Sequence, residues 1–103
     1  PISPLIGVEN EVTVLPDEFE LVQNYPNPFN PTTSIQFTIS NRQFVTLKIY
    51  DILGREVAVL INNQMQAGQY EYKFNAENLK SGIYFYTLSS KGFSDTKKLV
   101  IVK

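Results

Sequence analysis

Hydrophobic and polar residues alternate through most of this chain, and this period of two constrains its fold more than any other feature. Ile35, Phe37 and Ile39 are separated by polar residues, and the same alternation recurs at residues 45–49 and 70–74. Such alternation gives a β-strand one buried face and one solvated face. No window contains a 3.6-residue apolar stripe long enough for a helix of two turns. The sequence therefore predicts an all-β fold.

Seven strands are expected, separated by breaks that contain the turn-forming residues Gly and Asn. They cover residues 19–22, 33–39, 45–49, 56–61, 70–74, 83–88 and 96–102. Seven short strands at a spacing of about 8 to 12 residues predict an immunoglobulin-like antiparallel β-sandwich. Residues 83–88 are apolar at almost every position, so we expect a central strand covered on both faces. We also expect a monomer with Phe37, Leu47, Phe74 and Phe85 in its core.

Residues 1–17 differ in composition from the rest of the chain. They contain three prolines and one glycine, and only Val12 and Val14 alternate. This pattern predicts a linker from an upstream cargo to a domain formed by residues 18–103. The alternative is that part of the segment adds an edge strand. No basic stretch followed by an apolar one opens the chain, so a secretion leader is expected upstream.

The composition argues against several classes of function. A net charge of −1 leaves no excess of Lys and Arg to neutralise phosphates, so we expect no nucleic-acid partner. With no His and no Cys, the chain lacks the most common general base, the thiolate nucleophile and the usual zinc ligands. We therefore expect no catalytic residues, no metal and no cofactor. The apolar runs are far shorter than the roughly 20 residues that span a bilayer.

One pair of carboxylates could still support chemistry. Asp51 and Glu56 flank a short turn and could act as a retaining-hydrolase pair if they were held about 5 Å apart. The favoured interpretation is structural: Asp51 bonds backbone amides of its own turn, Gly54 adopts a positive φ, and Arg55 offsets the local charge.

Residues 24–31 (NYPNPFNP) hold three prolines, which lack the backbone donors that a central strand needs. The segment is therefore predicted to follow an edge or to cross between sheets, with Tyr25 and Phe29 anchored on the core. The alternative is a polyproline-type ligand for an aromatic groove.

Two further surfaces are candidates for binding. Tyr50, Tyr84 and Tyr86 could share an outward face and stack on sugar rings, although half-buried strand tyrosines are the alternative. From Lys91 onward the chain has four lysines and one acidic residue. A charged edge of this kind normally discourages strand pairing between molecules.

Five segments in order resemble the type A C-terminal sorting domain of the type IX secretion system. They are residues 21–33 (LVQNYPNPFNPTT), 45–57 (VTLKIYDILGREV), 67–70 (AGQY), 79–86 (LKSGIYFY) and 96–103 (TKKLVIVK). Each segment alone is a weak signal, whereas five at these spacings are specific.

The resemblance implies a folded signal that requires no chemistry of its own. Such a domain ends a cargo protein that crosses the periplasm, is recognised by outer-membrane secretion machinery and reaches the cell surface or the medium. A sortase-like surface protease commonly removes the domain. The alternative function is a surface-adhesion or carbohydrate-binding module.

The resemblance also assigns candidate residues. Those expected to carry the signal are Gly82, Tyr84, Lys97, Lys98, Leu99, Val100 and Lys103. Those expected to set the conformation are Tyr25, Pro26, Asn27, Pro28, Asp51, Gly54, Arg55 and Gly68. The backbone edge of the last strand could pair with a partner strand by β-augmentation.

Overall fold

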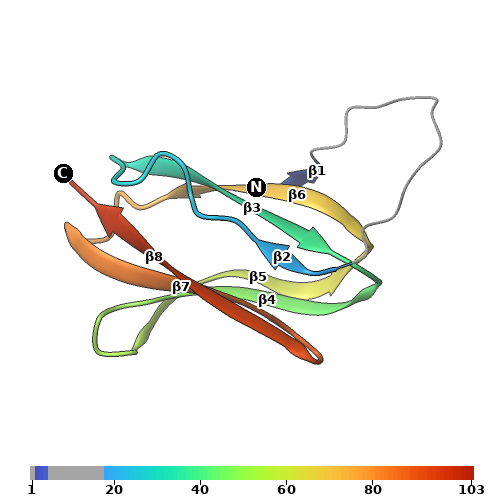
Figure 1. The fold of residues 1–103 in the computed structure, drawn as a ribbon. Helices are drawn as coiled ribbons and strands as arrows, with labels where there is room; N and C mark the ends of the chain where they lie inside the picture. The colour runs from blue at the N-terminus through green and yellow to red at the C-terminus, as the bar shows by residue number, and fades with distance from the viewer. Residues whose placement is uncertain (1, 5–17) are drawn as a thin grey trace.

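The computed structural model describes residues 2–4 and 18–103, and its strands form two antiparallel sheets that pack face to face (Figure 1). The strands in this part of the chain are β1 (Ile2–Pro4), β2 (Glu20–Leu21), β3 (Thr32–Ile39), β4 (Gln43–Tyr50), β5 (Glu56–Met65), β6 (Gly68–Asn75), β7 (Gly82–Ser90) and β8 (Phe93–Ile101). One sheet has the order β1-β6-β3-β2 and the other β5-β4-β7-β8. The predicted immunoglobulin-like β-sandwich is confirmed.

The seven strands expected from the period of two correspond to β2–β8. Strand β1 falls within the segment expected to be a linker and pairs with the edge of β6, with Ile2 opposite Tyr72 and Pro4 opposite Tyr70. The alternative of an edge strand therefore holds for these three residues. Residues 1 and 5–17 lie outside the described part of the chain, so the linker remains a prediction.

The core lies between the two sheets and is built from every second residue of each strand. Val45, Leu47 and Ile49 of β4 are fully buried and belong to the same core cluster as Ile35 and Phe37 of β3 in the other sheet. Burying each such side chain stabilises the fold by about 1.5–3 kcal/mol relative to exposure. The expected core positions Phe37, Leu47 and Phe74 are confirmed.

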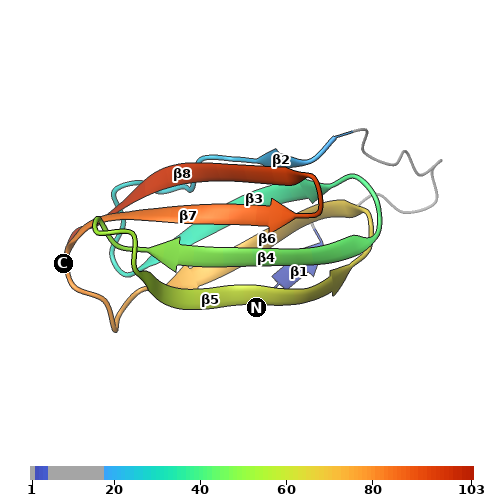
Figure 2. The ribbon, with the colours of Figure 1, turned by 90° about the horizontal axis from the view of Figure 1, so that it is seen from below.

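The prediction that Phe85 lies in the core is wrong. The side chains of β7 that point inward are Tyr84, Tyr86 and Leu88, whereas Phe85 is half-buried on the outer face. Strand β7 is central within its sheet, between β4 and β8. However, no described element covers the outer face of that sheet, and the other sheet lies on the opposite side (Figure 2). The expectation that residues 83–88 are covered on both faces is therefore also wrong.

Candidate recognition surface

The proline-rich segment crosses from one sheet to the other, as its proline spacing predicts. It begins beside β3, where Val22 N donates to Gln36 O at 2.9 Å. Tyr25 and Ser34 then exchange two backbone hydrogen bonds of 3.0 and 2.9 Å. Beyond this point the chain leaves β3, and Phe29 forms a parallel bridge with Ile101 of β8. The segment thereby closes one open side of the sandwich.

The crossing segment occupies part of the outer edge of β8. Phe29 N donates to Val100 O at 3.1 Å, and Val102 N donates to Phe29 O at 3.0 Å. The side chain of Asn27 accepts from Val100 N at 2.9 Å, and Gln23 Nε2 donates to Lys98 O at 2.6 Å. The expectation that a partner strand pairs along this edge is therefore wrong for residues 98–102. Such pairing could occur only on the earlier part of β8.

Asn24 fixes the start of the crossing, a role that no pattern in the sequence predicts. Its side chain is buried and donates to Pro26 O at 3.2 Å and to Thr33 Oγ1 at 3.0 Å. Thr33 Oγ1 also donates to Pro26 O at 2.8 Å. These bonds hold the segment against the first residues of β3.

Tyr86 ties the same segment to the opposite sheet. Its hydroxyl accepts from Asn24 N at 2.7 Å and donates to Val22 O at 2.8 Å. The ring is fully buried. Burial disfavours the phenolate and raises the pKa of Tyr86 to about 12. Tyr86 is therefore a structural residue.

Of the two aromatic residues in the proline-rich segment, only Phe29 is an anchor. Phe29 is 3% exposed and its ring centroid lies 6.2 Å from that of Phe74. Tyr25 is 81% exposed, so the prediction that it packs on the core is wrong. Tyr25 bridges Ser34 of β3 before the chain turns inward at Phe29, which leaves the Tyr25 ring in solvent. Pro26, Asn27 and Pro28 are also exposed.

The proposed outward strip of tyrosines does not form. Tyr84 and Tyr86 point into the core, and of the three only Tyr50 lies on the outer face of its sheet. Half-buried tyrosines were the alternative, but these two are more deeply buried. The structure thus offers no row of these rings for sugar stacking.

The turn at residues 51–55 is built as its residues predict. Asp51 Oδ1 accepts from Leu53 N and Arg55 N, both at 2.9 Å, and Asp51 Oδ2 accepts from Arg55 Nε at 2.8 Å. The backbone hydrogen bond from Arg55 is the main cause that lowers the pKa of Asp51. Gly54 has φ +81°, which favours glycine. Glu56 instead forms an ion pair of 3.2 Å with Lys48, so the structural interpretation of Asp51 fits better than a hydrolase pair.

Two strands begin with the same Gly-x-Tyr device. Tyr70 Oη donates to Gln66 O and Tyr84 Oη donates to Lys80 O, both at 2.9 Å and four residues upstream. The Tyr70 ring also covers Gly68: a Cβ on this glycine would lie 3.6 Å from the ring. The arrangement is similar to the tyrosine corner of immunoglobulin-like domains. The repeated Gly-x-Tyr spacing at residues 68–70 and 82–84 is the sequence signal for this arrangement.

The candidate residues of the last strand divide between core and surface. Leu99 is fully buried and Val100 is half-buried, whereas Lys98 and Lys103 are exposed. Lys97 lies 3.9 Å from the carboxylate of Asp95. Only the lysines and part of Val100 are therefore accessible to a partner while the domain is folded.

The backbone of Lys103 is held at the end of the sandwich where β8 ends. Its N–H donates to Ser81 Oγ at 3.0 Å, and its Nζ donates to Glu77 O at 2.6 Å. Gly82, Tyr84 and the 51–55 turn lie at this end, because β7 begins and β4 ends there (Figure 1). Gly68 lies at the opposite end, where it is paired with the last residue of β3. The structure thus places most of the candidate residues, but not all of them, at the end of the sandwich where β8 ends.

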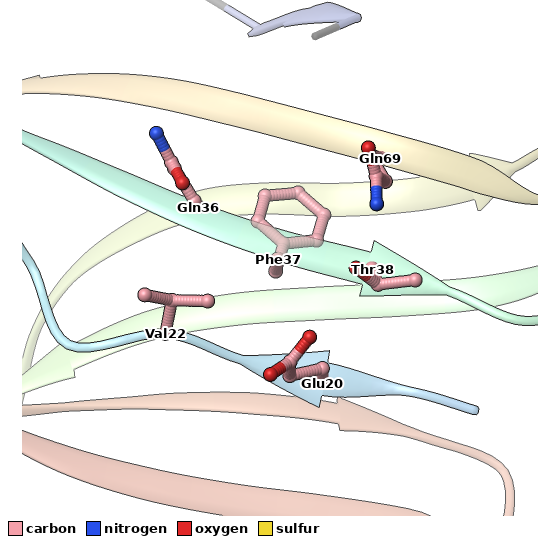
Figure 3. A pocket seen from close by; sticks show the side chains of 6 residues that line it. All are labelled: Glu20, Val22, Gln36, Phe37, Thr38 and Gln69. Carbon is pink, nitrogen blue, oxygen red and sulfur yellow. The ribbon is translucent and has the colours of Figure 1, made fainter. Parts of the chain in front are cut away.

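A shallow hollow of about 130 Å³ opens beside β2 and β3 (Figure 3). Its lining residues are Glu20, Val22, Gln36, Phe37, Thr38 and Gln69. A single carboxylate among amides and a hydroxyl provides no acid–base pair. Within residues 2–4 and 18–103, no group of three or more Asp or Glu side chains could hold a metal ion. The same residues include no helix that could cross a membrane.

Comparison with known families then assigns the chain. The family described as the secretion system C-terminal sorting domain matches residues 23–102. The chain belongs to this family. No curated protein and no solved structure matches it.

The sorting domain is thus a signal for type IX secretion, which exports its substrates to the cell surface or the extracellular space. The matched range begins at Gln23, which donates a hydrogen bond to Lys98 O at the edge of β8. It ends at Val102, whose N–H donates to Phe29 O. The crossing segment and the terminal strand of the sorting domain therefore form one connected unit.

Proposed function

We propose that this sorting domain directs an upstream cargo from the periplasm through the outer membrane and is recognised as a folded surface, without catalysis of its own. The observation that carries the proposal is the division of the last strand. Leu99 is fully buried while Lys98 and Lys103 are exposed. The strand that the family resemblance identifies as the signal is therefore part of the sandwich core. A receptor that binds the exposed lysines of this strand can therefore do so while the domain remains folded.

The alternative of a carbohydrate-binding module has less support. It depended on Tyr50, Tyr84 and Tyr86 sharing an outward face, whereas Tyr84 and Tyr86 are buried. Stacking on sugar rings requires accessible aromatic faces. No other observation favours this alternative.

Replacing Lys97, Lys98 and Lys103 together with Ala is expected to reduce export without unfolding the domain. Their charges contribute little to stability, because exposed ion pairs such as Lys97–Asp95 are worth about 0–1 kcal/mol. The chain would be fused behind a periplasm-directed reporter in a bacterium that has a type IX secretion system. The exported fraction of the reporter is then compared with the melting temperature of each purified fusion. A bulky tag after Lys103 should have the same effect.

The matched control replaces Lys73 and Lys91 with Ala, which removes exposed positive charge away from the terminal motif. This control should be exported like the parent. Parental export of both the folded triple variant and the tagged domain would show that recognition lies elsewhere. A parent fusion that stays in the periplasm although the secretion system is active would contradict the sorting role itself.

We further propose that a sortase-like surface protease removes the domain by cleaving within or just before residues 1–17. Proteases require an extended chain, and residues 1–17 have the composition of a linker. Mass spectrometry of mature cargo from the cell surface or medium should find its last residue in this region. Surface cargo that uniformly retains the intact sandwich would refute the cleavage but not the sorting role.

A further inference from the structure

One end of the sandwich exposes large apolar side chains that are not part of the core. Ile52 and Leu53 are 68% and 71% exposed at the tip of the 51–55 turn, and Ile83 and Val102 are 44% and 49% exposed. We call these four residues the apolar end patch. Exposed apolar surface that is contiguous and bordered by polar groups marks interaction sites in soluble proteins.

The strand register places the four residues, which come from three parts of the chain, at one end of the sandwich. Tyr50 pairs with Phe85, so the turn that follows Tyr50 extends towards the start of β7. Ile83 pairs with Val100 of β8, and Val102 follows two residues later. The 51–55 turn, the start of β7 and the end of β8 lie at the same end in both views (Figures 1 and 2).

The exposure of Ile52 and Leu53 is imposed by a well-bonded turn. Three hydrogen bonds to the carboxylate of Asp51 fix the loop, and Gly54 supplies its positive φ. Neither Ile52 nor Leu53 is among the residues that form or pack against the core. Polar residues would serve the turn equally well, since turns favour them. The apolar tip is therefore presented to solvent by a defined backbone.

Positive charge borders the patch. Lys80, Lys98 and Lys103 are exposed at this end of the sandwich. None of the three forms a salt bridge with a carboxylate in the described part of the chain. Asp51 and Glu56 at the same end are already paired, with Arg55 and Lys48 respectively. The border of the patch thus carries cations that lack an acidic partner within the domain.

We propose that the apolar end patch, with its border of lysines, docks on a protein of the outer-membrane secretion machinery whose site is an apolar pocket edged by carboxylates. The inference rests on the proposed function and names the surface through which it operates. Burial of the apolar side chains would supply affinity, and pairing of the lysines with carboxylates would supply orientation and selectivity. The other candidate surfaces fit less well, because the hollow beside β2 is mainly polar and residues 98–102 of the β8 edge are already bonded.

Two pairs of substitutions test the patch in the reporter fusion. Ile52→Thr with Leu53→Thr removes its apolar tip, and Lys98→Glu with Lys103→Glu reverses its border charge. Each pair is expected to reduce the exported fraction at least fivefold with an unchanged melting temperature. Ile52→Met with Leu53→Met retains the apolar surface and should be exported like the parent.

The matched control makes the same chemical changes near the opposite end. Phe44, which is 44% exposed, is replaced with Thr and Lys91 with Glu. This variant should be exported like the parent. If the Thr pair lowers the melting temperature, the lysine reversal and the Met pair decide the outcome.

The outcomes separate this inference from the sorting role. Failure of the parent fusion to be exported contradicts the proposed function. Parental export of the folded Thr pair and the folded Glu pair overturns this inference but not the sorting role.

A binding assay distinguishes a protein partner from a lipid surface. Purified chain is mixed with vesicles of phosphatidylethanolamine and phosphatidylglycerol. Binding that the Thr pair abolishes would replace the protein partner with a lipid surface, whereas absence of binding supports the protein partner.

Discussion

Replacing Tyr86 with Phe is expected to lower the free energy of unfolding by about 2–4 kcal/mol, although it removes only one oxygen atom. The hydroxyl bonds both Asn24 N and Val22 O at 2.7 and 2.8 Å inside the sandwich. Without it, a buried donor and a partly buried acceptor lose their partner. Losing the partner of a buried group costs about 1–3 kcal/mol, and the partly buried acceptor contributes towards the lower end of that range. Urea denaturation of parent and variant measures the difference.

The pH dependence of stability provides a second readout for Tyr86. Its pKa is raised from 10.0 to about 12 by burial, so the folded state holds the proton more tightly than the unfolded state. This contribution to stability is complete below pH 10 and is lost as the pH rises through 12. The Phe variant should lack this component of the alkaline loss of stability.

Tyr84→Phe is the matched control for Tyr86→Phe. Tyr84 makes one side-chain hydrogen bond, to the backbone of Lys80, so its loss should cost only about 1 kcal/mol. Equal stability of the Tyr86 variant and the parent, with the same alkaline profile, would contradict the described contact between β7 and the crossing segment.

Replacing Leu99 with Ala is expected to cost about 2–5 kcal/mol, because the side chain is fully buried and its removal leaves a cavity. Leu99→Met keeps most of the volume and should cost less than about 1.5 kcal/mol. Lys98→Ala changes the neighbouring exposed residue and should leave the unfolding free energy nearly unchanged. Equal effects of Leu99→Ala and Lys98→Ala would show that the terminal strand is not packed in the core.

The alternation of apolar residues predicted strands such as β3, β4 and β6, because each strand of a sandwich has one buried face. It failed where the alternation disappears. In β7 both Phe85 and its neighbours Tyr84 and Tyr86 are apolar or aromatic, so the sequence held no signal for which set points inward. The hydroxyl of Tyr86 fixes which residues of β7 point inward, and its hydrogen-bond partners Asn24 and Val22 lie more than 60 residues away in the sequence.

Long-range pairing also explains why the candidate site was only partly predicted. The 51–55 turn could be predicted because its bonds join residues within five positions of each other. By contrast, the hydrogen bonds of Gln23 and Asn27 to the edge of β8 join residues about 75 positions apart. No local sequence pattern encodes them. The apolar end patch likewise arises only when the register places the turn, β7 and β8 at one end.

If the sorting signal is the folded sandwich, the exported fraction of a reporter depends on the stability of the domain. The parent, Leu99→Met and Leu99→Ala form a series of decreasing stability with an identical lysine surface. Each fusion is expressed in the same bacterium, and its folded fraction is measured at the growth temperature. We predict that export follows the folded fraction and falls sharply for Leu99→Ala if that variant is largely unfolded. Export of a largely unfolded variant at the parental level would show that the sorting signal does not require the folded sandwich.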